Sequence, residues 1–538
     1  MNRELQELRS RQESDHVLSN SEPSTVNTSH SSQPASEELV HDDFDFYEDT
    51  VALDGVLVDS HLAIGAFQIF AEVFRPQLPL LEIINVRDIH VSQSFLFWTI
   101  LVIVSSHLPG APHQDVYTRL HEPYTKLLKE EALGVPLPLH KIQALIFLCA
   151  WPLPIEAQVK DPSWLYCGIA IQAARYMGLD REQPLPTTRS MGVTPGTRRA
   201  RINTWLGCFY VGTSLSLHLG LQPPIDSDLD FAIIHTFLNE KTISFDFAAQ
   251  VRIHLVIAKF TNILLQNTSD VVGSSLVRLV NGELDAIKSA FHDDDAGSLK
   301  LEFSILVTKL HFHALMITKS PLTSPSRELM LQAGLTAAMR IIYISSRPTR
   351  STFSSLGDGD LLSVQRQRAL PKTYYRGVAF ATVFLITFFH LNASASQEER
   401  QSAASHISMA QSVFNTCSID SLDEYARAAR MFEILTRLPP GSADPNKLRL
   451  THRMGVSILF NATRIADEAR GRRTDSVENL EGKGGVPQSA SQAQEAQLDM
   501  LYPMQQMGPA EFEMLRQLGW VDPLTNPFNV DSIYGPQY

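Results

Sequence analysis

Cysteine is scarce in this chain, and its cysteines are too far apart to build a metal site. There are four, Cys149, Cys167, Cys208 and Cys417, and no C-x2-C pair occurs. Structural zinc sites made from cysteine need thiolates at short spacings in the sequence. The four cysteines of this chain therefore cannot form one. The first three cysteines lie on apolar helical faces. We therefore expect buried free thiols, which suit a reducing compartment.

Charge is also low, and hydrophobic runs are short. Charged residues make up 19% of the 538 residues and the formal net charge is −13, so the chain as a whole repels phosphate backbones. The most apolar runs, Phe95–Val104 and Val378–Leu391, fall short of the roughly 20 residues that a membrane helix needs. The first twenty residues lack the apolar core of a signal peptide. These absences predict a soluble intracellular protein with no membrane contact.

Catalytic motifs are absent as well. The sequence contains no G-x-S-x-G, G-x-x-x-x-G-K-[ST], G-x-G-x-x-G or H-E-x-x-H pattern. His311 and His313 form an H-x-H pair, but on a helix residues i and i+2 point about 200° apart and cannot share a metal. We expect no enzymatic activity, and no catalytic, cofactor-binding or metal-binding residues in this chain.

The sequence does carry helical periodicity, from about residue 60 to residue 465, without a clear alternating strand pattern. The predicted fold class is all-α: an irregular array of a dozen or more helices with disordered acidic segments at both ends. The predicted helices are 60–75, 93–107, 114–133, 139–150, 162–178, 198–219, 245–267, 272–291, 299–319, 326–347, 371–392, 396–416, 420–438 and 448–470.

Composition divides the chain into four parts. Residues 1–59 are predicted to be a disordered acidic leader, and residues 60–470 an all-helical regulatory domain. Residues 471–497 have the composition of a linker, and residues 498–538 regain hydrophobicity as an acidic, aromatic-rich tail.

The most informative stretch runs from residue 139 to residue 225. It contains LHKIQALIFLCAWPLP, then DPSWLYCGIAIQAARYMGLD, then RRARINTWLGCFYVGTSLSLHLGLQPPI, which we interpret as three packed helices. Pro152 ends the first, because proline cannot continue the hydrogen-bond ladder. Asp161 caps the second and Gly178 ends it. On the inward faces of the second and third helices we expect five buried residues: Trp164, Ile171, Trp205, Leu206 and Phe209.

The order of these features resembles the middle homology region of fungal zinc-cluster (Zn2Cys6) transcription factors. In that family a Leu-rich helix ending in Trp-Pro leads to a WLYxGxAIxxAxxLGL-like helix and an RxWxxCFxxDRxLSxxxGRPP-like helix. The resemblance covers roughly residues 60–440 in layout, with its specific motifs between 139 and 225. It implies a regulator of RNA polymerase II-dependent transcription in a fungal nucleus, of the branch that includes regulators of leucine biosynthesis and secreted proteases.

The DNA-reading module of that family holds two zinc ions with six cysteines, and these are missing here. Zinc, and contact with DNA, are therefore expected only if a cluster is supplied upstream of this chain. We expect a truncated DNA-binding factor, which a C-x2-C-x6-C exon upstream would reveal. The alternative is a non-DNA-binding helical co-regulator or interaction protein that pairs with a full-length factor. The implied partners are zinc-cluster factors, in homodimers or heterodimers, and coactivators bound through the acidic ends.

The third motif departs from the family pattern. Gly212-Thr213 stand where the family often has Asp-Arg, and Gly220-Leu221-Gln222-Pro223 stand where it has Gly-Arg-Pro. Losing a buried acid–base pair predicts repacking or an altered cavity at this position.

Two acidic segments carry interleaved aromatic residues. Glu37–Asp59 holds nine acids and no base around Phe44, Phe46 and Tyr47, while residues 491–538 hold six acids and one base. Acidic neighbours keep apolar side chains solvated and free for the groove of a coactivator. The alternative for each segment is that its aromatic residues pack on the main domain. For the first segment we favour that alternative.

Two basic stretches flank loops, and neither has aromatic residues at stacking spacing. We expect solvated loop edges rather than nucleic-acid sites. The residues are Arg189, Arg198, Arg199 and Arg201 in the first stretch, and Arg340, Arg347, Arg350, Arg366, Arg368 and Lys372 in the second. Arg470, Arg472 and Arg473 form a weak nuclear import signal.

Overall fold

The structure is a computed structural model, and its described elements belong to one compact unit that begins at Asp42. It describes residues 41–108, 110, 112–155, 160–184, 196–240, 242–266, 270–290, 295–320, 324–347, 359–391, 395–420, 423–437 and 453–462. The linker and the tail predicted after residue 470, and most of the acidic leader, lie outside these residues.

A short hairpin opens the folded unit. β1 (Thr50–Leu53) pairs antiparallel with β2 (Val56–Asp59), and Asp54 and Gly55 form the turn with φ values of 48° and 84°. Two-residue hairpin turns of this kind need positive φ at both positions, which is why Asp-Gly is favoured there. The described residues are otherwise mostly helical, which confirms the predicted all-α fold class. The hairpin itself was not predicted, and it places residues 50–59 in strands where the sequence predicted a disordered leader.

The acidic segment before the hairpin lies against the helical domain. Asp42 accepts two hydrogen bonds from the guanidinium of Arg75, at 2.8 and 2.6 Å, and a third from the backbone N–H of Ile84 at 2.9 Å. The ring of Phe46 packs edge-on against His90, whereas Tyr47 is 77% exposed. Phe44 also packs against the hydrophobic core, and the guanidinium carbon of Arg87 lies 5.0 Å from the centre of the Tyr47 ring. The favoured alternative, docking on the chain's own domain, therefore describes Phe44 and Phe46, while Tyr47 stays largely exposed.

Helices follow one another through the N-terminal half, and α2 continues into a π-helical turn at Phe70–Phe74 and a 3-10 turn at Arg75–Gln77. The bounds of α6 and α9 are those expected from sequence, while α3 and α10 were not expected. The helices are α2 (Ser60–Ile69), α3 (Val86–Ser92), α4 (Ser94–His107), α5 (His113–Leu133), α6 (Leu139–Ala150), α7 (Ser163–Tyr176), α9 (Arg198–Leu219) and α10 (Asp228–Leu238).

The C-terminal half consists of longer helices, and α15 is the one without a sequence prediction. The helix predicted at 448–470 is seen only as a 3-10 turn (Met454–Val456) with helical residues 457–462, and the rest of it lies outside the described residues. The helices are α11 (Phe245–Gln266), α12 (Asp270–Ala290), α13 (Asp295–Lys319), α14 (Pro325–Ser346), α15 (Gly359–Arg368), α16 (Lys372–Leu391), α17 (Gln397–Cys417) and α18 (Glu424–Thr436).

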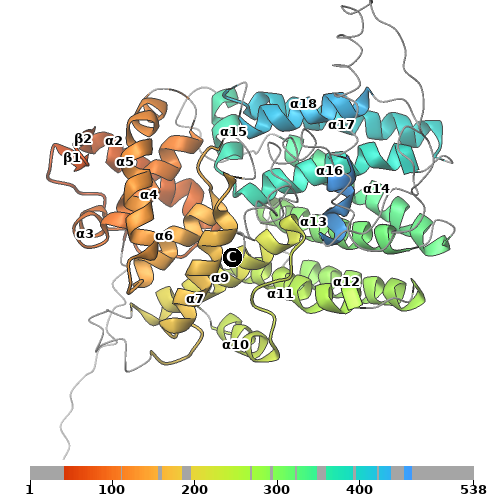
Figure 1. Cartoon of the computed structure of the whole chain (residues 1–538), viewed down its shortest axis with the longest axis horizontal. Helices are drawn as coiled ribbons and strands as arrows, with labels where there is room; N and C mark the ends of the chain where they lie inside the picture. Colours follow the sequence, from red (N-terminus) through yellow and green to blue (C-terminus); the bar gives the residue numbers. More distant parts are fainter. Residues whose placement is uncertain are drawn as a thin grey trace, which may run out of the picture. The chain divides into compact units, whose positions relative to one another are not determined.

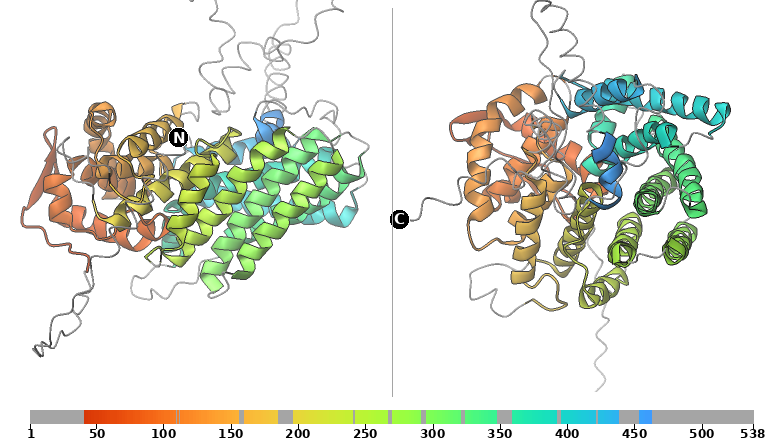
Figure 2. Two further views of the ribbon diagram at one scale, coloured as in Figure 1. Left: turned by 90° about the horizontal axis from the view of Figure 1, so that it is seen from below. Right: turned by 45° about the vertical axis from the view of Figure 1, so that its right-hand side comes forward.

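Two hydrophobic cores share helix α11. Core 1 runs from the hairpin to α11, and core 2 from α11 to residue 462. Val251 and Leu255 of α11 face core 1, while Ile253 and Ile257 face core 2. In Figure 1, α9 and α11 lie between the N-terminal helices and the helices α12, α13 and α14, and Figure 2 shows α11 and α12 running side by side.

Three of the longer helices are strongly apolar. Phe245–Gln266, Leu299–Lys319 and Pro325–Ser346 are long and apolar enough, by length and composition alone, to cross a membrane. Polar residues interrupt their apolar runs, which is why the sequence did not single them out. In the structure 72% of the most apolar stretch of each of the first two is buried, and 44% of the third. Helix α11 is apolar on two sides because it packs between two cores.

Four of the five residues expected in the interior are buried. Ile171 is 2% exposed, and Trp205, Leu206 and Phe209 are fully buried, as predicted. The prediction for Trp164 is wrong, because its side chain is 47% exposed. The buried arc of α7 carries Cys167, Ala170, Ile171 and Ala174, and Trp164 lies at the edge of the opposite arc.

Candidate functional site

The two cores meet along a set of buried polar side chains, which we call the polar seam. Helix α9 comes from core 1, α11 is shared, and α13 and α16 come from core 2. Uncompensated burial of polar groups is unfavourable, so such a concentration inside a domain needs partners. The seam consists of Asp161, Thr213, Ser214, His218, His254, His311, Lys372 and Arg376.

A serine–histidine pair joins α9 to α11. Ser214 Oγ lies 2.6 Å from His254 Nε2, and His254 Nδ1 lies 2.7 Å from the carbonyl oxygen of Gln250. Because a carbonyl only accepts, Nδ1 carries the proton, and the Ser214 hydroxyl donates to Nε2. The ring of Tyr210 covers this imidazole at a centroid distance of 4.5 Å. The pair is a buried cross-link between helices.

Two further histidines join α9 to α13. His218 meets His311 edge-on at 5.2 Å between centroids, and His311 stacks on Phe380 of α16 at 4.0 Å. Burial lowers the pKa of His311 to about 3 and that of His254 to about 4. Burial, with His311 and Arg376 nearby, lowers the pKa of His218 well below its ordinary value. These imidazoles are therefore neutral at pH 7 and act as polar packing groups.

An ion cluster forms the other end of the polar seam. Asp161 Oδ2 lies 3.0 Å from both Lys372 Nζ and Arg376 Nη2, and Lys372 Nζ lies 2.9 Å from Glu424. Burial alone would raise the pKa of Asp161. The attraction of Lys372 and Arg376, with hydrogen bonds from Ser163, outweighs it and lowers the pKa below its ordinary value. The carboxylate stays ionised and links the segment before α7 to α16.

Neighbouring contacts continue this link between the cores. Arg368 donates to the carbonyl oxygens of His107, at 3.1 Å, and Cys417. The indole N–H of Trp151 donates to the carbonyl of Ala369 at 2.8 Å. Hydrogen bonds thus link the end of α15 and the segment that follows it to core 1.

The second basic stretch differs only in part from its prediction as a solvated loop edge, because Arg347 is exposed as expected. Arg368 and Lys372 are buried, and Arg340 pairs with Glu302 at 2.8 Å. Arg350 lies outside the described residues.

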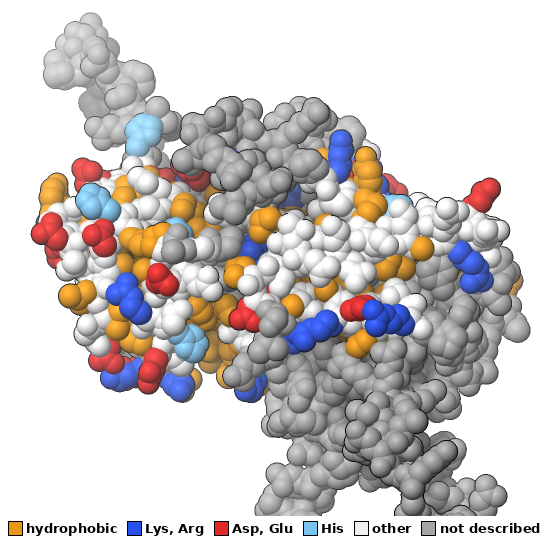
Figure 3. Space-filling model, turned by 90° about the horizontal axis from the view of Figure 1, so that it is seen from above, with side chains coloured by type: hydrophobic (Ala, Val, Ile, Leu, Met, Phe, Trp, Pro, Cys, Tyr) orange, Lys and Arg blue, Asp and Glu red, His pale blue; other side chains and the backbone are white. Residues whose placement is uncertain are grey.

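The first basic stretch anchors the start of α9. Arg198 pairs with Glu240, and Arg199 lies 3.7 Å from Glu82. Arg201 is buried, contrary to expectation, and donates to the carbonyls of Gly178 and Arg181. Arg189 and the predicted import signal lie outside the described residues. On the face in Figure 3, the Lys and Arg side chains are separated by acidic, hydrophobic and neutral ones.

The four cysteines are buried free thiols, as predicted. Cys149 Sγ lies 3.1 Å from the carbonyl oxygen of Ser163. Burial raises the pKa of Cys149 well above its ordinary value and that of Cys417 to about 11. The described residues contain no group of three or more His, Cys, Asp or Glu side chains that could hold a metal ion.

The Gly212-Thr213 departure overlaps the polar seam, of which Thr213 is a member. A Cβ atom at Gly212 would meet Pro224 Cγ at 2.9 Å and Ile171 Cδ1 at 3.1 Å, so no room exists here for an aspartate side chain. The Thr213 hydroxyl is fully buried and has no hydrogen-bond partner among the described residues. Pro224 and Ile171 thus occupy the space that a side chain at position 212 would need.

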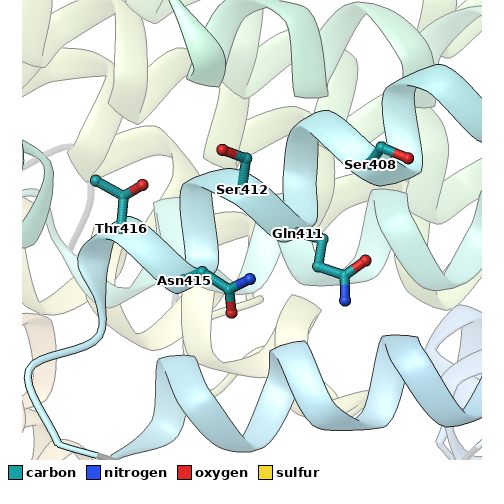
Figure 4. A pocket seen from close by; sticks show the side chains of 5 residues that line it. All are labelled: Ser408, Gln411, Ser412, Asn415 and Thr416. Atoms are coloured by element: carbon teal, nitrogen blue, oxygen red, sulfur yellow. The ribbon is translucent and has the colours of Figure 1, made fainter.

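An open hollow of about 460 Å³ lies on α17. Its lining residues all come from this helix and carry no charge: Ser408, Gln411, Ser412, Asn415 and Thr416. Figure 4 shows these side chains spread along the helix rather than converging. A ligand site needs a few convergent polar groups, and this surface does not provide them.

Comparison with known proteins bears on this architecture. Residues 67–276, from α2 to the start of α12, match the family described as the fungal specific transcription factor domain. SEF1 of Eremothecium gossypii is 29% identical over 265 residues, which is 48% of this chain and 23% of that protein. The transcriptional regulatory protein SEF1 of Candida albicans is 24% identical over 247 residues, or 44% of this chain and 26% of that protein.

A further relative is the transcriptional activator of proteases prtT of Aspergillus niger. It is 31% identical over 124 residues, which is 22% of this chain and 19% of that protein. The matched segments thus span about a quarter or less of these relatives. No solved structure matches the chain. The family consists of transcription factors, not of enzymes.

Proposed function

Because residues 67–276 match the fungal specific transcription factor domain, we propose that this chain is the regulatory region of a zinc-cluster-type factor. It acts on RNA polymerase II-dependent transcription in a fungal nucleus. The observation that carries the proposal is that the matched segment contains α6, α7 and α9, the helices with the family motifs. The relatives named as transcription regulators support it.

DNA contact in this proposal comes from outside the described domain. The chain carries a formal net charge of −13, and the basic residues at the start of α9 are paired with acids or buried. A zinc cluster supplied upstream, or by a partner factor, would therefore read the DNA. The proposed partners are zinc-cluster factors, in homodimers or heterodimers, and coactivators that bind the acidic ends.

The test is a tethering experiment with the full chain. Fused to a foreign DNA-binding domain, the chain should change the output of a reporter with matching sites, compared with that binding domain alone. The fusion should also accumulate in the nucleus when it carries no added import signal. A well-expressed fusion that leaves the reporter unchanged would contradict the proposal.

A second measurement separates the two forms of the proposal. An upstream exon encoding C-x2-C-x6-C would make the chain part of a DNA-binding factor. The co-regulator form instead expects no specific DNA binding by the isolated chain at near-physiological salt, together with co-purification of a zinc-cluster partner.

A further inference from the structure

We propose that the outward face of α7 is a self-association surface, through which two copies of this chain pair with their α7 helices antiparallel. This names a surface for the homodimer proposed above, and so rests on that proposed function. The surface, called the α7 stripe, consists of Trp164, Leu165, Gly168, Gln172 and Tyr176, all of which are exposed.

The α7 stripe presents large apolar side chains to solvent. Trp164 and Leu165 are each 47% exposed, and Tyr176 is 67% exposed. The opposite arc of the helix, with Cys167 and Ile171, supplies core 1. Exposed apolar patches of this kind are typical of protein–protein contacts, and tryptophan and tyrosine are the commonest anchors there.

Gly168 lies in the middle of the α7 stripe, and no close contact within the described residues requires a glycine there. A Cβ atom placed on it would meet nothing within 4 Å, and its backbone is helical. A glycine in a helix costs about 0.5–1 kcal/mol relative to alanine. Its absence of a side chain would instead let the backbone of a second helix approach closely, as small residues do at helix–helix contacts.

The spacing of the α7 stripe makes it complementary to itself. Positions 164, 168, 172 and 176 form one row of residues four apart, the ridge used in helix packing at crossing angles of about −50°. A two-fold axis near residue 170 would place Trp164 against Tyr176 of the second copy. It would also place Gly168 against Gln172 of that copy. Each of these contacts then occurs twice with the two copies exchanged, as an isologous pair requires. Large residues lie at both ends of the contact and the glycine near its centre.

Charge favours this face over others for pairing two identical chains. Each copy carries a formal net charge of −13, so most approaches bring like charges together. The α7 stripe has no charged residue, and Arg175 beside it is paired with Asp230 of α10 at 2.9 Å. The α7 stripe has five residues, far fewer than the roughly 20–30 per side of stable complexes, so we expect a weak dimer, with a Kd of about 10 µM or above.

Sedimentation velocity of the purified full chain tests the proposal. We expect a monomer–dimer equilibrium between about 1 and 200 µM. Gly168→Leu should fill the crossing point and raise Kd at least about tenfold, without lowering Tm, because the space around it is open. Gly282→Leu is the matched control. Gly282 is also helical and exposed, lies on α12, and would likewise meet nothing within 4 Å if it carried a Cβ atom. It should leave Kd unchanged.

Other outcomes would overturn the proposal. A chain that stays monomeric over this range lacks the dimer, while the regulatory role tested with the reporter would stand. If Gly168→Leu and Gly282→Leu dimerise equally, the contact lies elsewhere. Trp164→Ala should also raise Kd, and a dimer that dissociates as salt rises would point to a charged surface instead.

Discussion

Two tryptophans on neighbouring helices, Trp164 on α7 and Trp205 on α9, differ in how much of their surface folding removes from water. Trp205 is fully buried, and Trp164 is 47% exposed. Trp205→Ala should lower the free energy of unfolding by about 3–5 kcal/mol, because a large cavity remains. Trp164→Ala leaves no enclosed cavity and should cost about 1 kcal/mol or less. Urea denaturation of both variants checks the difference, and equal losses would contradict the assigned burial.

His311 makes the stability of the domain depend on pH. Its pKa is lowered to about 3 by burial, from an ordinary value of 6.5. Between these values the unfolded chain binds a proton that the folded chain does not, so stability falls as pH falls through this window. His311→Phe keeps a ring against Phe380 but removes the proton. The slope of unfolding free energy against pH between 6 and 4 should decrease by about 1.4 kcal/mol per pH unit.

Urea denaturation at several pH values measures that slope. The other buried histidines remain in the variant, so part of the acid sensitivity should persist. Parallel lines for the wild type and His311→Phe would mean that His311 is solvated or already charged in the folded state.

At the scale of elements, the end of α9 depends on one glycine. Gly220 has a φ of 66°, and a Cβ atom there would lie 2.0 Å from the carbonyl oxygen of Arg453. Gly220→Ala therefore combines a left-handed conformation, which costs about 1–2 kcal/mol, with displacement of the turn at Met454–Val456. We expect a loss of at least about 2 kcal/mol in unfolding free energy, measured by urea denaturation. Gly282→Ala, in open space within a helix, should instead add about 0.5–1 kcal/mol.

The long elements could be predicted from sequence because their signals are local. Helix α6 has an apolar face bounded by Pro138 and Pro152, and α9 begins after a capping threonine and ends at Gly220. The missed elements, β1, β2, α3, α10 and α15, are each at most 11 residues long. Periodicity is weak over such lengths, although Asp54-Gly55 was a hairpin signal that could have been used.

The polar seam could not be predicted in the same way. Its members, such as Asp161, Ser214, His254 and Arg376, lie on different elements, and no local spacing relates them. Periodicity tells which face of a helix is buried but not which helix lies opposite. A usable signal was polar residues within apolar helical stretches, such as Arg376 in KTYYRGVAFATVFL. The prediction for Trp164 was wrong for a related reason. The motif predicts that Trp164 lies in a helix, but it does not tell which face of that helix packs against the core.

At the scale of the whole molecule, the family match and the two cores divide the chain differently. The match ends at residue 276, early in α12, yet α11 packs into both cores and the polar seam binds α16 to core 1. Core 2 therefore packs against α11, a helix of the matched segment. Buried ion pairs from Asp161 to Lys372 and Arg376 join it to core 1 as well. Removing residues beyond 276 would expose the side of α11 that packs into core 2, so we expect the matched segment alone to be less stable than the whole domain.

The acidic tail is the part of the molecule proposed to contact coactivators. Residues 491–538 carry six acids against one base, with Phe512, Leu515 and Leu518 spaced for one helical face. These residues lie outside those that the structure describes. Fused to a foreign DNA-binding domain, 491–538 should activate a reporter, because acidic neighbours keep the apolar side chains free for a partner's groove. Changing these three residues and Trp520 to alanine should abolish activation. Arg516→Ala is the matched control and should not, since it leaves the apolar face intact. A silent but well-expressed fusion would rule out activation by the tail.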